Sequence, residues 1–594
     1  MRRFLCVVAA VLAAAGVAAP AASAHALLQD TTPERGATLK QAPDRIVMRF
    51  NEPVEVAFGA VRVFDARGRQ VEQGSPFHPG DDGRAVAVRL RGGLPRGGYT
   101  ATYRVISADS HPVSGGFVFA YGSGAAPGAT VDQLLAGQNT GPVTRVAFAL
   151  VRALEYGAIA VGIGALAVLL LAWLPGLRAA IHVSERGRLD DWESASASFA
   201  RRVRALLVGA GVVGVLAATA ALALQAATAA GTSLWSALGE VNAVFETRFG
   251  VIWGAAVIAW LLVVVLAAAR PAAVPAMRPA TVGAAGTALP GAGPWIAALA
   301  LPLLALAFLP GLGGHAGVQS PVAVLLPANV IHVLAASAWI GGITVLVAAL
   351  PAATRRLAPE NRTRLLAGVM PRFSTLALIA VIALLAGGIL QSLLMLTAVD
   401  DLVDTAFGRA ILVKATIVLV LIGAGAVHRR RILPGLERAA AAGTPPGRPG
   451  VLLRRVLRAE VALGVAALVA TGALAGYAPA DAQPTGPYSA TATLGPARAE
   501  LTVEPARPGP NEIHLYLFNR RDGRQYDAPK ELRVEASLPE RGIQPVKFPA
   551  EKGGPGHYVI SGAALSPPGT WRLEVVARVS AFDELRTSFK VPIR

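Results

Sequence analysis

The stretch ALLVGAGVVGVLAATAALALQAAT, residues 205–228, contains no charged side chain. A helix of about 20 apolar residues crosses the hydrocarbon core of a bilayer, so this stretch predicts a transmembrane helix. The whole composition agrees, because 54% of the residues are hydrophobic and only 15% are charged. Eight such spans are predicted by the apolar runs, at 147–174, 205–228, 249–269, 293–312, 325–350, 374–397, 409–427 and 456–477.

Arginines gather in alternate connections between these spans, at 178–204, 355–372 and 428–458. The connection at 310–321, PGLGGHAGVQSP, has no charge at all. The positive-inside rule predicts that the arginine-rich connections are cytoplasmic. We therefore expect a multi-pass protein of the cell (inner) membrane with both chain ends extracytoplasmic. The net charge of +18 then reflects topology rather than binding to nucleic acid.

The N-terminus has the features of a secretory signal peptide at 1–24. Arg2 and Arg3 precede an apolar run, and Ala22-Ser23-Ala24 is a small-residue cleavage site. Cleavage makes His25 the first residue, with an α-amine and an imidazole that can chelate one metal ion. An uncleaved signal anchor is the alternative. The single cysteine, Cys6, lies in the removed segment, so we expect no disulfide and no thiolate metal site.

Two soluble domains flank the membrane part, at 25–122 and 479–594, with a linker at 123–145 and the helical domain at 146–478. RIVMRF, residues 45–50, alternates in hydrophobicity, as a half-buried strand does. TWRLEVVARV, which begins at Trp571, does the same. We expect an N-terminal all-β Greek-key barrel or sandwich, an eight-helix transmembrane bundle and a C-terminal all-β sandwich.

Asp109 and His111 form a candidate metal site in the segment ADSHPV, residues 108–113. In an extended backbone, residues two apart point to the same face. With the amine and imidazole of His25 they make a nitrogen and oxygen donor set typical of Cu(II). Zinc also uses such ligands, and a solvated loop pair is the simpler alternative.

Residues 25–122 resemble the CopC family of extracytoplasmic copper-binding β-barrels. The matching segments are HALLQDTTPERGATL at 25–39, MRFNEPVE at 48–55 and SADSHPVSGGFVFAYG at 107–122. The resemblance implies that His25, Asp109 and His111 bind Cu(II). It also implies that Glu52 lies near the metal without binding it directly; a plain turn residue before Pro53 is the alternative.

Polar side chains also lie within or beside the predicted spans, where they are costly and indicate function. His315 follows the fourth span, and His332 lies in the fifth. Asn329 shares a helix face with His332, while Gln391 and Met395 are near the end of the sixth span. Imidazole, amide and thioether donors suit copper. Hydrogen bonding between packed helices is the alternative for each of them.

Residues 146–478 resemble the CopD family of copper-resistance membrane proteins. The resemblance rests on GGHAG at 313–317, ANVIHVLAASAWIGGI at 328–343, RFSTLALIAVIALLAGGILQ at 372–391 and FGRAILVKATIVLVLIGAGAVHRRR at 407–431. It implies copper transfer across the inner membrane and points to His315 and His332. Lys414 is given no ligand role. The tail at 480–594 resembles the YtkA-like β-sandwich, and His514 and His557 are expected on its surface.

The sequence thus predicts a copper-homeostasis or copper-resistance protein that captures Cu(II) outside the membrane and imports copper through its helices. Copper ion, membrane lipid and other extracytoplasmic copper carriers are the expected partners, and nucleic acid is not. No nucleophilic triad or phosphate-binding loop predicts an enzyme. The alternatives are copper sequestration or sensing without transport, and a membrane haem oxidoreductase.

Overall fold

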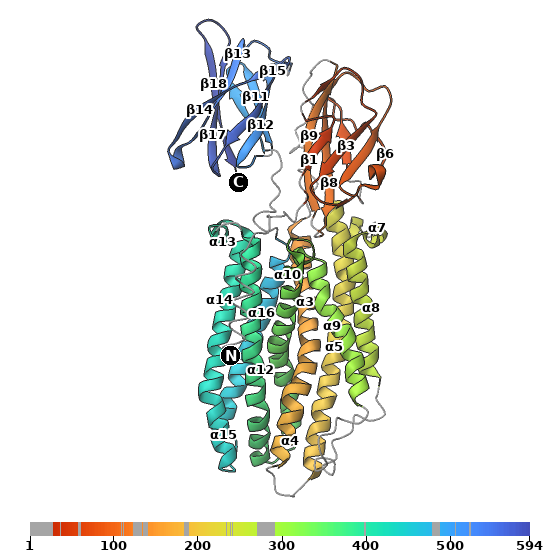
Figure 1. Cartoon of the computed structure of the whole chain (residues 1–594), viewed down its shortest axis with the longest axis vertical. Helices are drawn as coiled ribbons and strands as arrows, with labels where there is room; N and C mark the ends of the chain where they lie inside the picture. Colours follow the sequence, from red (N-terminus) through yellow and green to blue (C-terminus); the bar gives the residue numbers. More distant parts are fainter. Residues whose placement is uncertain are drawn as a thin grey trace. The chain divides into compact units, whose positions relative to one another are not determined.

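The computed structural model describes two compact units (Figure 1). One holds the helices of Gly141–Ala226 and Val244–Ala482, and the other holds His25–Thr140, Ala227–Ala243 and Gln483–Arg594. The described residues are 26, 28–35, 37–56, 61–108, 110, 112–122, 134, 141–182, 189–232, 234–237, 239, 241–269, 292–396, 399–477, 488–504, 506–521 and 524–593.

The N-terminal β domain consists of two sheets. One has the strand order β1-β3-β7-β6, and the other β2-β9-β8-β4 with β5 also paired to β8. The strands are β1 (Leu28–Thr32), β2 (Thr38–Leu39), β3 (Arg45–Phe50), β4 (Val54–Glu55), β5 (Val61–Phe64), β6 (Glu72–Phe77), β7 (Ala85–Leu90), β8 (Gly97–Ser107) and β9 (Pro112–Tyr121), with a short 3₁₀ turn, η1 (Pro79–Asp81), before β7.

The alternating pattern of RIVMRF is confirmed. Ile46, Met48 and Phe50 are fully buried in the core of this domain, whereas Arg45 and Arg49 are exposed. Phe117 and Phe119 of β9 join the same core. Burial of large apolar side chains of this kind, at roughly 1.5–3 kcal/mol each, holds the two sheets face to face.

The helical unit contains eight helices that are long and apolar enough to cross a membrane, as predicted, among the described residues. Its elements are α3 (Pro142–Ala167), η2 (Val168–Trp173), α4 (Leu174–His182), α5 (Leu189–Ala230), α8 (Arg248–Ala268), α9 (Ala292–Leu312), η5 (His315–Gly317), α10 (Val322–Ala336), η6 (Ser337–Gly341), α11 (Gly342–Thr354), α12 (Pro359–Met395), α13 (Asp401–Asp404), α14 (Ala406–Val427), η7 (His428–Ile432), α15 (Leu433–Ala441) and α16 (Gly447–Leu474). The short helices α6 (Leu234–Ala237) and α7 (Val241–Phe245) precede α8.

Several helices run well beyond the predicted spans. Arg201, Arg202 and Arg204 lie within α5, and Arg372 lies within α12, so the prediction that they occupy connecting loops is wrong. Arginine has a high helix propensity, and its long side chain can extend away from the apolar part of the helix.

The eight helices fall into two halves of four that share local features. α8 and α14 each begin with a Thr-x-Phe-Gly segment, in which Thr247 caps Gly250 N at 3.1 Å and Thr405 caps Gly408 N at 2.9 Å. A short helix, α7 or α13, precedes each segment. The first helix of each half also carries a π-helical segment, η2 or η6. The second half therefore repeats the layout of the first.

The two leading helices of these halves cross at glycines. A Cβ on Gly164 of α3 would lie 2.4 Å from the carbonyl carbon of Gly341, and a Cβ on Gly341 would lie 1.8 Å from the oxygen of Ala160. Only glycine permits such an approach of two helix backbones. The sequence positions of these glycines therefore fix where α3 meets η6.

The C-terminal β domain is a second two-sheet structure, with strand orders β10-β11-β12-β16-β15 and β14-β13-β17-β18. Trp571, Leu573 and Val575 are buried on one face of β17, as predicted. The strands are β10 (Tyr488–Leu494), β11 (Ala497–Glu504), β12 (Gly509–Asn519), β13 (Glu531–Leu538), β14 (Ile543–Pro549), β15 (Glu551–Gly554), β16 (His557–Leu565), β17 (Gly569–Arg578) and β18 (Glu584–Ile593), with a 3₁₀ turn, η9 (Pro539–Arg541), after β13.

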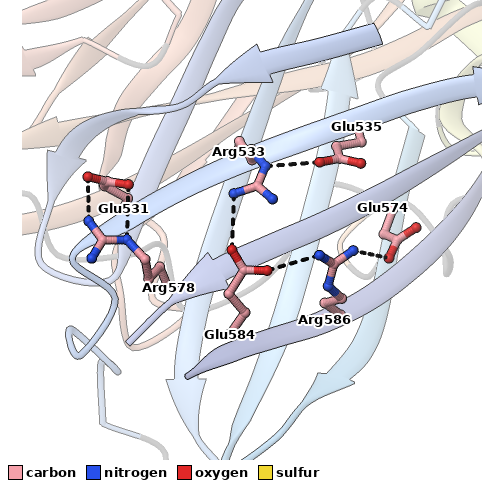
Figure 2. A network of polar contacts seen from close by, with 7 residues as sticks. All are labelled: Glu531, Arg533, Glu535, Glu574, Arg578, Glu584 and Arg586. Atoms are coloured by element: carbon pink, nitrogen blue, oxygen red, sulfur yellow. Dashed lines mark hydrogen bonds and ion pairs between the residues drawn. The ribbon is translucent and has the colours of Figure 1, made fainter. Parts of the chain in front are cut away.

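The opposite face of the second sheet carries a network of ion pairs, shown in Figure 2. Arg533 contacts Glu535 at 2.9 Å and Glu584 at 3.4 Å, and Arg586 contacts Glu584 at 2.9 Å and Glu574 at 3.3 Å. Arg578 pairs with Glu531 beside it. The network makes this face polar, as expected for the solvent side of an antiparallel sheet.

Candidate functional site

The three predicted Cu(II) ligands, His25, Asp109 and His111, lie outside the described residues. Their immediate neighbours are described. Ala26 is 1% exposed and belongs to the core of the N-terminal β domain, and Ser110 is 9% exposed. The residues next to the predicted ligands are therefore fixed in the fold.

Strand register brings these neighbours to one end of the domain. Leu28 at the start of β1 pairs with Phe50 at the end of β3. Val54 of β4 then pairs with Ser107, the last residue of β8, and Pro112 at the start of β9 pairs with Ile106. The strand ends that flank 25, 52, 109 and 111 thus meet at the same edge, although these residues are far apart in the sequence.

The expectation of an extended backbone does not hold at the middle of the Asp-x-His segment. Ser110, its middle residue, has a φ of 71° and donates its backbone N–H to Ser107 O at 2.8 Å. The antiparallel strands β8 and β9 must reverse direction here, and a residue in the left-handed region makes the tight turn. A same-face argument based on strand periodicity therefore does not apply to this segment.

Glu52 lies in the bend between β3 and β4, at the same edge, and is half-buried. Phe50 beside it is held by a backbone hydrogen bond from its N–H to Arg84 O at 2.8 Å. The bend follows from Pro53, which fixes φ and cannot donate to the ladder. Glu52 therefore carries a carboxyl to the edge where the four strand ends meet.

Polar side chains of α10 and α12 meet along one helix interface, which contains Asn329, His332 and Gln391. Asn329 Nδ2 donates to Gln391 Oε1 at 3.2 Å, and Gln391 Nε2 donates to Gly387 O at 3.0 Å. His332 Nδ1 lies 3.1 Å from Leu384 O. A Cβ on Gly388 would lie 3.3 Å from His332 Cε1, so the imidazole packs on a glycine surface of α12.

The remaining predicted residues lie toward the end of this interface. His315 begins η5 and is half-buried, and its carbonyl accepts from Gln319 N at 2.8 Å. Gln319 Nε2 reaches Leu394 O of α12 at 3.4 Å, next to the half-buried Met395 that ends that helix. Lys414 of α14 lies near enough to His332 for an electrostatic interaction. Imidazole, amide and thioether groups thus follow one another along α10 and α12.

Sequence reasoning missed a buried carboxyl in the helical unit. Glu155 of α3 is 3% exposed and accepts a hydrogen bond from Trp260 Nε1 of α8 at 2.7 Å. It precedes the crossing residue Gly164 by nine positions, as His332 precedes Gly341. The signal available in the sequence was a glutamate inside an apolar helix, where an ionisable side chain is costly.

The prediction that His514 and His557 lie on the surface is wrong, because they are 1% and 6% exposed. His514 Nδ1 lies 3.2 Å from His557 Nε2, on neighbouring strands β12 and β16. Among the described residues, no group of three or more His, Cys, Asp or Glu side chains is placed to hold a metal ion.

Comparison with known proteins gives a consistent result. The CopC domain family matches residues 28–122, and the Copper resistance protein D family, CopD, matches residues 367–474. Copper transport protein CutJ of Bacillus subtilis (strain 168) is 28% identical over 578 residues, which cover 95% of this chain and 95% of that protein.

Shorter relatives match the separate parts. Copper resistance protein C of Escherichia coli is 28% identical over 104 residues, or 16% of this chain and 82% of that protein. Inner membrane protein YebZ of E. coli (strain K12) is 26% identical over 244 residues, or 40% and 74% of the two chains. The crystal structure of CopC from Methylosinus trichosporium OB3b shares 27% identity, covers 16% of this chain and 93% of that one, and has a TM-score of 0.16. One polypeptide thus contains both a CopC domain and a CopD domain, and it is similar to the copper transport protein CutJ over almost its whole length.

Proposed function

We propose that this protein binds Cu(II) outside the cell membrane through its N-terminal β domain and imports copper through its helices. His25, Asp109 and His111 are the proposed Cu(II) ligands, with Glu52 beside them. The path continues by His315 and along Asn329, His332, Gln391 and Met395. The protein acts as a carrier rather than an enzyme, and copper is its substrate.

The meeting of four strand ends at one edge of the N-terminal domain supports the Cu(II) site most directly. β1 begins there, β3 ends there, and the β8–β9 turn lies beside β4. A terminal amine, two imidazoles and a carboxylate form a tetragonal donor set that suits Cu(II). The names of the relatives, a copper transport protein and a copper resistance protein, point the same way.

The polar interface between α10 and α12 supports transport rather than simple anchoring. An anchor needs one apolar helix, and polar side chains in a membrane are costly. Here, imidazole and amide groups follow the interface from His332 to Gln391, and Gln319 continues it to Leu394. Alternating access along this interface would move copper inward, and the arginine-rich helix ends would lie in the cytoplasm.

A copper titration of the N-terminus tests the Cu(II) site. The purified protein with His25 at its end is compared with a form that carries one extra alanine before it. We expect a large loss of Cu(II) affinity in the extended form, because the α-amine of His25 becomes an amide. Equal affinity of the two forms would refute the terminal chelate.

Copper influx into proteoliposomes tests transport. We expect His332→Ala to abolish uptake while His428→Ala, the matched change at the start of η7, retains it. Cu(I) and Cu(II) are supplied separately, with and without a proton gradient, which identifies the transported state and the driving force. Absence of uptake by the wild-type protein, with intact Cu(II) binding, would favour sequestration instead.

A further inference from the structure

The histidine pair of the C-terminal domain occupies the face of its sheet that is turned away from the core. Ile513, Leu515 and Leu517 of β12 point into the core. His514 and Tyr516 alternate with them and so lie on the other face, where His557 of β16 joins them. Both imidazoles are nevertheless buried, so this face is not an ordinary solvent surface.

The two imidazoles point at each other along a line. The N···N distance from His514 Nδ1 to His557 Nε2 is 3.2 Å, and the ring centroids are 5.5 Å apart. The centroid distance exceeds the N···N distance by 2.3 Å, which is about twice the distance from the centre of an imidazole ring to one of its atoms. The two centres and the two nitrogens therefore lie nearly on one line. The ring planes differ by only 17°. The two nitrogens are therefore aimed directly at one another.

Both rings are held in this orientation by their neighbours. Tyr516 stacks on His557 with centroids 4.3 Å apart and planes within 9°. The other nitrogen of His514, Nε2, faces Glu512 Oε1 at 3.6 Å. A histidine that binds a metal commonly has its second nitrogen near a carboxylate, which fixes the tautomer and makes the ligand more basic.

We propose that His514 Nδ1 and His557 Nε2 form a second copper site of this protein, a two-coordinate imidazole site for Cu(I). Imidazole is a good copper ligand, and the closed-shell Cu(I) ion accepts two donors in a line. The choice of copper over other soft cations rests on the proposed function, whereas the geometry of the pair does not.

The pair needs a small movement to accept the ion. Metal–nitrogen bonds to histidine are about 2 Å long, so two opposed bonds place the nitrogens about 4 Å apart. The rings must separate by less than about 1 Å from their 3.2 Å contact. His557 is the first residue of β16 and follows Gly556, which has a φ of 61° in the turn after β15. Its position beside a turn permits this shift.

The electrostatics of the face favour a cation and neutral ligands. Both imidazoles are buried, which disfavours their charged form and favours the neutral rings that bind a metal. Glu512 Oε1 lies 3.6 Å from His514 Nε2, and on the neighbouring strand β11 Glu500 pairs with Tyr516 and Glu504 pairs with Glu512. A cation bound at the pair would offset the burial of these carboxyls.

Cu(I) binding to the purified full-length protein tests the site. Under reducing, oxygen-free conditions and in competition with a coloured Cu(I) chelator, we expect His514→Ala and His557→Ala to bind one Cu(I) fewer per chain than the wild type. Tyr516→Phe keeps the stacked ring and both imidazoles, so it should bind as the wild type does. Equal Cu(I) binding in the wild type and both alanine variants would overturn the proposal.

A second measurement needs no variant and therefore no assumption about folding. Silver(I), which prefers two collinear donors and does not change oxidation state, is added to wild-type protein with isotopically labelled histidines. We expect NMR coupling between silver and one nitrogen each of His514 and His557; its absence at full silver loading would overturn the site. Cu(II) affinity at the N-terminus and copper uptake in His514→Ala report separately on the proposed function.

Discussion

Trp260 Nε1 of α8 donates a 2.7 Å hydrogen bond to Glu155 Oε1 of α3, and so joins two helices of the bundle through buried polar groups. Trp260 is 0% exposed and Glu155 is 3% exposed. Oε2 of Glu155 has no hydrogen-bond partner within the described part of the chain. The indole is therefore the only hydrogen-bond donor that the described structure gives to this carboxyl.

Replacement of Trp260 by phenylalanine is expected to lower the free energy of unfolding by about 1–3 kcal/mol, because it leaves a buried carboxyl without its donor. Thermal unfolding in detergent measures the loss. Trp235→Phe is the control, since Trp235 is 79% exposed. In a Glu155→Leu background the cost of Trp260→Phe should be smaller, and an unchanged cost would contradict the role of the hydrogen bond.

Gly341→Ala is expected to destabilise the helical unit by about 1–3 kcal/mol or more, because the added Cβ would meet Ala160 O at 1.8 Å. Gly423→Ala is a matched control in α14, since a Cβ there meets nothing within 4 Å. That change should be neutral or stabilising, because alanine is the better helix former. Thermal unfolding and gel filtration compare the two variants. Equal stability would show that α3 and η6 do not meet through backbone contact.

Asp65→Asn is expected to loosen the β5–β6 hairpin in a pH-dependent way. The carboxylate accepts from Arg67 N, Arg69 N and Arg69 Nε, each at 2.9 Å. Burial works against ionisation, but these hydrogen bonds outweigh it and hold the pKa of Asp65 below its ordinary value. A carboxyl with a lowered pKa stabilises the fold above its unfolded pKa of about 4, and this contribution is lost as the pH falls through the folded pKa.

Hydrogen exchange of the hairpin amides measures this effect. At pH 7 exchange in Asp65→Asn should be faster than in the wild type, and the difference should shrink as the pH falls below about 4. The exposed Asp44 supplies the control, Asp44→Asn, which should leave these amides unchanged. A difference that grew at acidic pH would have the wrong sign for this explanation.

The effect of a charge reversal on the stability of the C-terminal domain should depend on whether the residue belongs to the network of Figure 2. Arg586→Glu would place a third carboxylate beside Glu574 and Glu584, so we expect a lower melting temperature. Arg572→Glu on β17 would face Lys590, which is its cross-strand partner, so we expect no loss. The difference in melting temperature between the two variants should become smaller in 1 M salt, where the Debye length is about 3 Å. A difference that did not depend on salt would point to packing instead of charge.

The eight spans and the two β domains could be predicted because burial leaves a local pattern of hydrophobic residues in the sequence, either a long run or an alternation. Runs such as 205–228 have no charge, and Ile46, Met48 and Phe50 alternate with exposed residues. Asn329 and His332 both reach α12, as their three-residue spacing on one helix face predicts. These features depend on local sequence alone.

Other features could not be predicted, because they arise where the regular helix or strand pattern is interrupted. The π-helical segment η6 begins at Ser337, so helix faces cannot be followed past this residue by counting in steps of an α-helix. Ser110 reverses the chain where an extended strand was expected. His514 was expected on the surface, and alternation along β12 does place it opposite the core residues, but it does not reveal that this other face is buried as well. The Thr-x-Phe-Gly motif occurs twice in the sequence, at 247–250 and 405–408. So short a motif indicates a structural repeat only once both copies are seen to begin helices.

The doubled arrangement of the helices has a consequence for how the protein can change. Glu155 and His332 stand equally far from glycines that touch, so one architectural plan holds an acid in its first copy and an imidazole in its second. Packing constrains the glycines, whereas the polar positions are free to diverge. Two copies of a scaffold can in this way acquire unlike chemistry at equivalent positions of the chain, so that similarity of backbone does not imply similarity of function.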